Sequence, residues 1–111
     1  MMTEYKPEYG AVWPLQEREI QILDEHRHDL VEFIDPCDLI TRMFSKGVIN
    51  HRQQRYINNL HDDTEKSEAL LDILRRGSVE NYRKTVFCLR ESNQSRVAEI
   101  LEDGGGRPTF L

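Results

Sequence analysis

Apolar residues recur at helical spacing through most of the chain, in six segments that polar or glycine-containing breaks separate. The first segment covers residues 16–34. Its apolar positions lie near one face of a helix: Ile20, Leu23, Leu30 and Ile34. Arg27 interrupts this stripe, and a bend or break within residues 25–28 would account for the interruption. The pattern therefore predicts a bent first helix.

Start and stop signals define the second and third helices. Asp35-Pro36 is typical of an N-cap followed by proline at the first helical position, and Gly47 ends the second helix. Asn50 and Gln53 have the spacing of a capping box and open a short third helix. Seven apolar or aromatic residues of these two helices are expected to point inward: Leu39, Ile40, Met43, Phe44, Tyr56, Ile57 and Leu60.

Three further helices are predicted in the second half of the chain. The fourth starts at residues 62–64 and stops at Gly77, the fifth is capped by Ser78 and ends at Ser92-Asn93, and a short sixth follows. Their inward positions include Leu70, Leu71, Ile73, Leu74, Val79, Tyr82, Val86, Phe87, Leu89, Val97, Ala98, Ile100 and Leu101.

Strand-like alternation is absent and the connections are short, so an all-α, six-helix antiparallel bundle is expected over residues 16–102. Each helix is too short to be stable alone in water, and packing of the helices against one another must stabilise the fold. Residues 1–15, with two prolines and no periodicity, are expected to form an irregular tail. Residues 103–111, with a glycine triplet, are expected to be a flexible tail or the start of a linker.

Length and charge narrow the classes of function. The chain has 111 residues with 20 acidic and 15 basic side chains, for a net charge of −5. This balance disfavours bulk electrostatic attraction to nucleic acid or to an anionic membrane. No apolar run approaches the roughly 18 residues of a transmembrane helix, so membrane insertion is not expected. Cys37 and Cys88 form no CxxC pair and are expected to be free thiols in a reducing cytoplasm.

Candidate catalytic and metal-binding residues do not converge. His26 and His28 are two positions apart and point to different helix faces, so a zinc site is not expected. Cys88 lies between Phe87 and Leu89, which favours a small buried residue over a nucleophile. The glycine triplet follows the last helix and lacks the geometry of a phosphate-binding loop. We expect no enzyme activity, no cofactor, no metal and no small-molecule substrate.

Three ordered stretches resemble the caspase recruitment domain (CARD), a branch of the death fold. They are Ala69-Leu70-Leu71-Asp72-Ile73-Leu74-Arg75-Arg76-Gly77, Val86-Phe87-Cys88-Leu89-Arg90-Glu91-Ser92-Asn93-Gln94 and Val97-Ala98-Glu99-Ile100-Leu101. The broken first helix and the Gly47-Val48-Ile49 hinge also fit. Residues 34–36 and their spacing are similar to the coiled-coil scaffold members of the family. The resemblance implies the Greek-key topology of the death fold. It also implies binding to like domains in adaptors or scaffolds, often as filaments that start apoptotic or innate-immune signalling.

Charge is segregated along the chain in a way that suits such binding. Residues 42–55 contain four bases and no acid, and we call these four the basic surface: Arg42, Lys46, Arg52 and Arg55. The fourth helix presents an acidic surface: Asp62, Glu65, Glu68 and Asp72. The resemblance implies that the second and third helices of one copy contact the first and fourth helices of the next, which is the most used contact in the CARD family. Head-to-tail pairing of unlike patches propagates as an open helix when its rotation does not close.

One position departs from the caspase-type members, in which the start of the fourth helix is basic rather than acidic. Arg27 lies where such members use a basic residue on the first helix, and it is therefore expected to be a protein-interaction residue. Three alternatives remain open. The chain is a CARD-only decoy that inhibits assembly by its partners, or a helical nucleic-acid-associated module that uses Arg83, Lys84 and Arg90, or a bundle whose charges are ordinary solvated faces. The favoured hypothesis is a cytoplasmic, homo-oligomeric adaptor or scaffold that binds other CARD-containing proteins.

Overall fold

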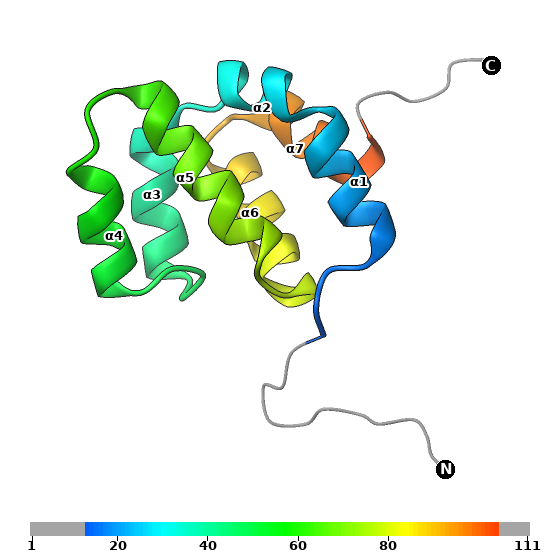
Figure 1. The fold of residues 1–111 in the computed structure, drawn as a ribbon, viewed down its shortest axis with the longest axis horizontal. Coiled ribbons are helices and arrows are strands. Elements are labelled where there is room, and N and C mark those ends of the chain that lie inside the picture. Colours follow the sequence, from blue (N-terminus) through cyan, green and yellow to red (C-terminus); the bar gives the residue numbers. More distant parts are fainter. Residues whose placement is uncertain (1–12, 105–111) are drawn as a thin grey trace, which may run out of the picture.

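Helices follow one another along residues 13–104, the part of the chain that the computed structural model describes, and no strand lies among them (Figure 1). The expected all-helical class is confirmed. The seven helices of this part are α1 (Glu17–Glu25), α2 (Arg27–Phe33), α3 (Pro36–Ser45), α4 (His51–Asn58), α5 (Asp63–Arg75), α6 (Val79–Glu91) and α7 (Ser95–Asp103).

The segment expected as one bent helix over residues 16–34 forms two helices. His26 ends α1, where its N–H donates to the Ile22 carbonyl at 3.0 Å, and it also precedes the first residue of α2. Its dihedrals, φ −105° and ψ 14°, depart from helical values, so the helix axis changes at this residue. The count among the described residues is therefore seven helices, where six were expected.

Capping side chains start three of the helices where the sequence predicted. At α4, Asn50 accepts from the Gln53 N–H at 2.8 Å and Gln53 accepts from the Asn50 N–H at 2.9 Å, which completes the capping box. At α5 and α6 a single cap bond forms, in which the side chains of Asp62 and Ser78 accept from the N–H groups of Glu65 and Asn81. Asp35 makes no side-chain cap at α3. The backbone N–H of Asp35 donates instead to the side chain of Gln94, 2.8 Å away, which joins the start of α3 to the α6–α7 turn.

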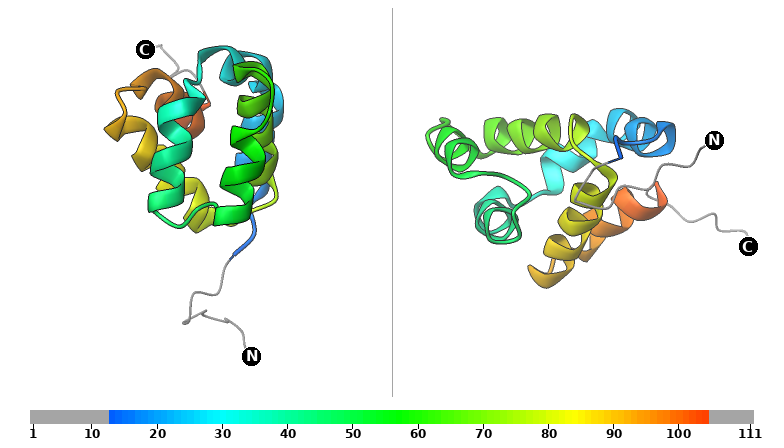
Figure 2. Two further views of the ribbon diagram at one scale, coloured as in Figure 1. Left: turned by 90° about the vertical axis from the view of Figure 1, so that its left-hand side faces the viewer. Right: turned by 90° about the horizontal axis from the view of Figure 1, so that it is seen from below.

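The helices pack around one core. Helix α3 contacts α4, α5 and α6, while α1 contacts α2, α5 and α7. Figures 1 and 2 show α4 at one end of the molecule and α1 at the other, with α5 running between them. The largest fully buried side chains come from almost every helix and include Leu30, Leu39, Ile40, Met43, Ile57, Leu70, Leu89, Val97 and Leu101. Core packing thus supplies the stability that the short helices lack alone.

Three aromatic residues expected to point inward lie on the surface. Phe44 is 38% exposed, Tyr56 60% and Phe87 49%, so the prediction of burial was wrong for each. Lys46 lies over the Phe87 ring, 4.7 Å from its centroid, and His51 makes an edge contact with Phe44. These cationic and polar neighbours cover part of the rings without burying them. In α4 the adjacent Ile57 is fully buried, and Tyr56 points away from the core.

Part of the expected tails lies outside the described residues, namely residues 1–12 and 105–111. Before α1, the Trp13 carbonyl accepts from the Val79 N–H at 2.8 Å and Pro14 forms an isolated bridge with Ser78. Leu15 is buried. Residues 13–15 are therefore attached to the start of α6. After α7, Gly104 adopts a left-handed conformation with φ 75°, as helix C-termini favour.

Candidate protein-interaction surfaces

The basic surface extends over α3 and α4, which pack side by side. Its four members differ in what they contact. Arg42 donates to Asp38 at 2.9 Å and lies 3.6 Å from Glu91 of α6. The hydrogen bond to Asp38 raises the pKa of Arg42, which is charged at all physiological pH values in any case. The charge of Arg42 is thus compensated within the molecule.

The other three bases of this surface have no carboxylate partner among residues 13–104. Lys46 lies over the Phe87 ring, and Arg55 contacts the His51 ring nitrogen Nε2 at 3.0 Å. Arg52 has no hydrogen bond or ion pair in this part of the chain. Since all three are exposed, their positive charges remain available to an acidic partner.

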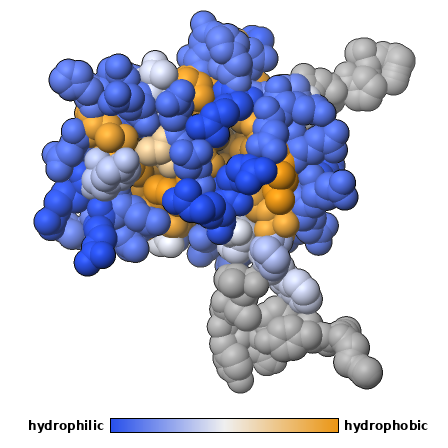
Figure 3. Space-filling model, viewed as in Figure 1, coloured by the Kyte–Doolittle hydropathy of each residue, from blue (hydrophilic) through white to orange (hydrophobic). Residues whose placement is uncertain are grey.

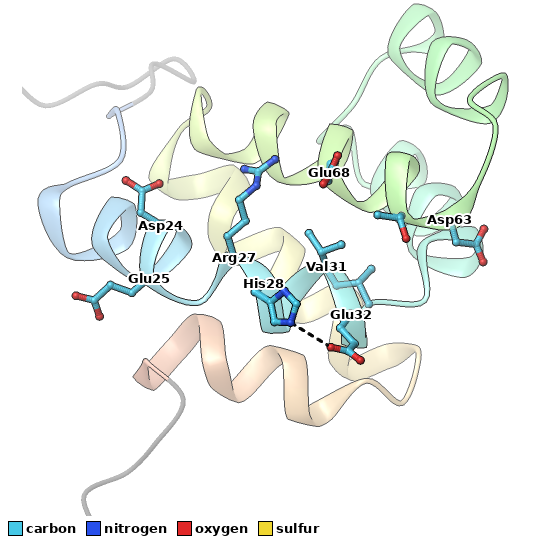
Figure 4. Close-up of a pocket in the computed structure, with 10 residues that line it drawn as sticks. Asp24, Glu25, Arg27, His28, Val31, Glu32, Asp63 and Glu68 are labelled. Carbon is cyan, nitrogen blue, oxygen red and sulfur yellow. Dashed lines mark ion pairs between the residues drawn. The ribbon is translucent and has the colours of Figure 1, made fainter.

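A hollow of about 910 Å³ opens between α1, α2 and the first half of α5 (Figure 4). Val31 and Ile34 form part of its wall. Five carboxylates line it, and they outnumber the two basic side chains, Arg27 and His28. The carboxylates are Asp24, Glu25, Glu32, Asp63 and Glu68. This arrangement makes the hollow acidic, and a concave acidic region suits a projecting basic side chain.

The four members of the acidic surface also differ in what they contact within the molecule. Asp62 accepts from the Glu65 N–H at 2.8 Å, and Glu65 accepts from the His61 N–H at 3.0 Å, so both carboxylates hold the start of α5. Asp72 forms an ion pair with Arg27 at 3.1 Å. Glu68 has no hydrogen bond or ion pair among the described residues and lines the acidic hollow. Of the four, Glu68 is the carboxylate most available to a partner.

Two ion pairs join α1 and α2 to the second half of α5. Arg75 donates to both oxygens of Asp24, at 2.9 and 3.0 Å, and Arg27 lies 3.1 Å from Asp72. Figure 4 shows the Arg27 side chain extending from α2 toward α5. The hydrogen bond from Arg75 holds the pKa of Asp24 below its ordinary value. One pair lies on each side of His26, so both short helices are joined to α5 by an ion pair.

A second hollow, of about 440 Å³, lies between α4 and the second half of α5. Arg52 and Tyr56 line it from α4, while Asp72 and Arg76 line it from α5. Ala69 and Ile73 add apolar surface. Members of the basic and acidic surfaces, Arg52 and Asp72, therefore line the same hollow, and charge segregation is less complete than the sequence predicted.

Hydrophilic groups dominate the face of the molecule seen in Figure 3, and apolar groups appear between them in separate places. On this face, a partner would meet charged and polar side chains rather than a continuous apolar patch. Within residues 13–104, no group of histidine, cysteine and carboxylate side chains is placed to hold a metal ion. No helix in this part is long and apolar enough to cross a membrane. Cys88 is buried, as expected, and burial raises the pKa of its thiol.

Glu25 and Glu32 were expected, with the other acids of the first helix, to support the acidic surface, and Asp63 was counted in the charge of the fourth helix without being placed on that surface. In the structure all three line the acidic hollow with Glu68. The spacing of Asp38 and Arg42, four residues apart on one helix, was a readable signal of their ion pair. The contact between Arg42 and Glu91 had no such signal, because it depends on how α3 packs against α6.

Comparison with models of protein families identifies the family of the chain. A family model described as the caspase recruitment domain matches residues 20–104, which include most of α1 and all later helices. Both hollows and every member of the basic and acidic surfaces lie within the matched residues. No curated protein matches the chain.

Proposed function

Because the chain belongs to the caspase recruitment domain family, we propose that it is an adaptor or scaffold that nucleates apoptotic or innate-immune signalling assemblies. The family consists of homotypic protein-interaction modules and not of enzymes. The observation that supports the proposal is the placement, on one molecule, of α4 bases that have no carboxylate partner among the described residues and of an acid-lined hollow between α2 and α5. One copy thereby offers a basic surface to the acidic surface of another.

The proposed contact depends mainly on side chains that have no ion pair within the molecule. Arg52 and Arg55 of one copy enter or border the acidic hollow of the next, where Glu68 and Asp63 are exposed. Glu32 also lines this hollow, but it already lies 3.6 Å from His28 of its own chain. Arg42, Asp62, Glu65 and Asp72 contribute less, because each already has a partner in its own chain. The proposed contact thus uses fewer side chains than the two surfaces predicted from the sequence.

Such a contact is heterologous, since it joins two different faces. Each added copy presents a free basic surface and a free acidic surface, so the assembly grows as a filament unless the rotation between copies closes a ring. Charge matching accelerates encounter and selects partners more than it adds affinity. Salt weakens the contact, because the screening length is about 8 Å at physiological ionic strength.

The proposed setting is the cytoplasm, and the proposed partners are other CARD-containing proteins and further copies of this chain. Both cysteines are free thiols, and free thiols persist where the medium is reducing. Cys37 is exposed, so an oxidising medium would allow it to form bonds between copies.

Charge reversal tests the proposal. The full chain is examined by size-exclusion chromatography and negative-stain microscopy at low and physiological salt. Arg52→Glu and Glu68→Lys should each weaken self-association by at least about tenfold, equivalent to about 1.4 kcal/mol, with helical content and melting unchanged. Mixing the two variants should restore part of the association, because each reversed surface then meets its opposite.

Arg83→Glu is the matched control, since Arg83 is an exposed arginine of α6 outside both surfaces. It should leave association unchanged. If Arg83→Glu weakens association as much as Arg52→Glu does, net charge and not the proposed contact governs assembly. If neither Arg52→Glu nor Glu68→Lys changes assembly, the proposed contact is wrong.

A CARD-only decoy is the second candidate. It is favoured by the finding that three of the four acidic-surface carboxylates are occupied within the molecule, which weakens one face more than the other. A module with one strong face binds the end of a partner assembly and stops its growth. The same experiment separates the two candidates: a decoy stays monomeric at high concentration and shortens the filaments of a CARD partner. In a separate arm of the experiment, duplex nucleic acid is added to test whether the α6 bases Arg83, Lys84 and Arg90 bind it.

A further inference from the structure

Tyr56 is an exposed aromatic residue beside two arginines without partners. Its side chain is 60% exposed, and its hydroxyl has no hydrogen bond among residues 13–104. Arg52 precedes it by four residues and so lies on the same face of α4. Arg76 reaches the same hollow from the C-terminal end of α5, and its side chain also lacks a partner in the described part of the chain.

We propose that Tyr56 is a phosphorylation site whose phosphate is bound by Arg52 and Arg76. A phosphotyrosine adds about −1.5 to −2 charges and three strong acceptor oxygens, and guanidinium groups bind such oxygens in pairs. The hollow of about 440 Å³ has room for the group. The carboxylate in the hollow, Asp72, opposes a phosphate only weakly, because Arg27 lies 3.1 Å from it.

The modification is an ordinary phosphoryl transfer by a protein tyrosine kinase. A bond forms between the Tyr56 oxygen and the γ-phosphorus of ATP, the bond from that phosphorus to the bridging oxygen breaks, ADP leaves, and the hydroxyl proton passes to the kinase. Access is favoured by the position of Tyr56, whose side chain is 60% exposed on the surface of α4.

The second described tyrosine gives the contrast. Tyr82 is 5% exposed, and its hydroxyl donates to the Leu101 carbonyl at 2.6 Å. A kinase would reach Tyr82 only after the α6–α7 contact opened. The structure therefore predicts modification of Tyr56 and not of Tyr82 in the folded chain.

The consequence for assembly depends on the function proposed above. A phosphate held by Arg52 and Arg76 compensates the charge of Arg52 from within the molecule, as Asp38 and Glu91 compensate Arg42. The basic surface then keeps Lys46 and Arg55 but presents a dianion beside them. Phosphorylation is thus expected to switch off the charge-matched contact.

The first test concerns the site alone. The full chain with Tyr5→Phe and Tyr9→Phe is treated with a soluble tyrosine kinase and Mg-ATP, then mapped by peptide mass spectrometry. One phosphoryl group on Tyr56 is expected, and Tyr56→Phe should take up none. Phosphorylation of Tyr82 in the folded chain, or no incorporation at Tyr56, would overturn the proposal.

The second test asks whether the arginines hold the phosphate. Phosphorus NMR of the phosphorylated chain should give a second phosphate pKa below the usual value of about 6. Arg52→Gln and Arg76→Gln should each move it back toward that value, whereas Arg83→Gln should not. A pKa unchanged by the first two variants would show that the arginines do not bind the group.

Association is measured separately, by size-exclusion at low salt, before and after phosphorylation. At least tenfold weaker association is expected for the phosphorylated chain. Unchanged association would overturn the switch while leaving the phosphate site. If the unmodified chain does not associate, the function proposed above fails, and the NMR result still decides the site.

Discussion

The guanidinium of Arg27, on α2, lies 3.1 Å from the carboxylate of Asp72, on α5, so two residues expected to contact other molecules contact each other. Together with the bidentate pair of Asp24 and Arg75, this contact holds α1 and α2 on α5 across the break at His26. Its role is to set the shape of the acidic hollow, because Arg27 and Asp24 both line that hollow.

The strength of the Arg27–Asp72 pair can be measured by a double-mutant cycle. Both side chains are partly exposed, at 38% and 51%, so solvent screens the pair. Arg27→Gln, Asp72→Asn and the double variant should give a coupling energy of about 0.5 kcal/mol in urea unfolding, and salt should reduce it. A coupling energy near zero would show that packing alone, without this pair, orients α2.

The Asp24 carboxyl makes the stability of the fold depend on pH in the acid range. Its pKa is lowered in the folded state, chiefly by the hydrogen bond from Arg75, so the folded protein binds fewer protons there than the unfolded chain. The stabilisation is complete well above the ordinary value of 3.8 and is lost as the pH falls through the lowered value. Melting temperatures of Asp24→Asn should therefore be lower than those of the parent near neutral pH and should converge with them in acid.

The match between sequence and structure was best where the signal was local. The capping box at Asn50 and Gln53 and the caps at Asp62 and Ser78 lie where they were predicted, since each needs residues only three positions apart. The Asp35 side chain makes no cap bond, and its backbone N–H donates to the side chain of Gln94, 59 positions away. Their contact depends on how α3 packs against α6, which ends just before the turn that holds Gln94.

The same difference between local signals and contacts set by helix packing explains which surface predictions were right and which were wrong. Hydrophobic periodicity placed Leu39, Met43 and Leu89 correctly in the core. It placed Phe87 there wrongly, since the ring is 49% exposed and lies under Lys46, the residue that follows α3. Charge counting located the acidic and basic segments but not the pairs between them. Whether Asp72 faces solvent or Arg27 depends on the angle between α2 and α5, which the break at His26 sets.

Ionisation of the Tyr82 hydroxyl should lower the free energy of unfolding at alkaline pH. Burial raises the pKa of its hydroxyl, so the stability it contributes is complete below the ordinary value of 10.0 and is lost as the pH rises above it. Tyr82→Phe removes the hydrogen bond to the Leu101 carbonyl and should cost about 1 to 2 kcal/mol at neutral pH by urea unfolding. The variant should lose less stability than the parent between neutral pH and alkali. An equal loss would mean that other groups cause alkaline unfolding.

Ser67 is expected to destabilise the fold. Its side chain is fully buried on α5, and its hydroxyl has no hydrogen-bond partner among the described residues. Ser67→Ala removes an unpaired polar group and adds helix propensity, so it should raise the free energy of unfolding by about 1 kcal/mol. Ser45→Ala, at an exposed helical position, measures the propensity part alone. Equal gains in the two variants would show that the buried hydroxyl carries no penalty.

Arg42 and Arg52 provide the sharpest comparison between the predicted surface and the structural one. Both are exposed or half-buried arginines of the basic surface, but Arg42 is paired with Asp38 and Glu91, whereas Arg52 has no partner within residues 13–104. A partner's carboxylate would have to compete with two existing acids at Arg42 and with none at Arg52. Arg52→Gln should therefore weaken self-association at least about fivefold more than Arg42→Gln, as measured by analytical ultracentrifugation at low salt. It should also lower the salt dependence of self-association more.

Arg42→Gln should lower the melting temperature instead, since it leaves Asp38 and Glu91 without their counter-charge. If Arg42→Gln weakens association as much as Arg52→Gln does, internal pairing does not protect a surface charge from a partner, and the proposed contact must again include all four bases.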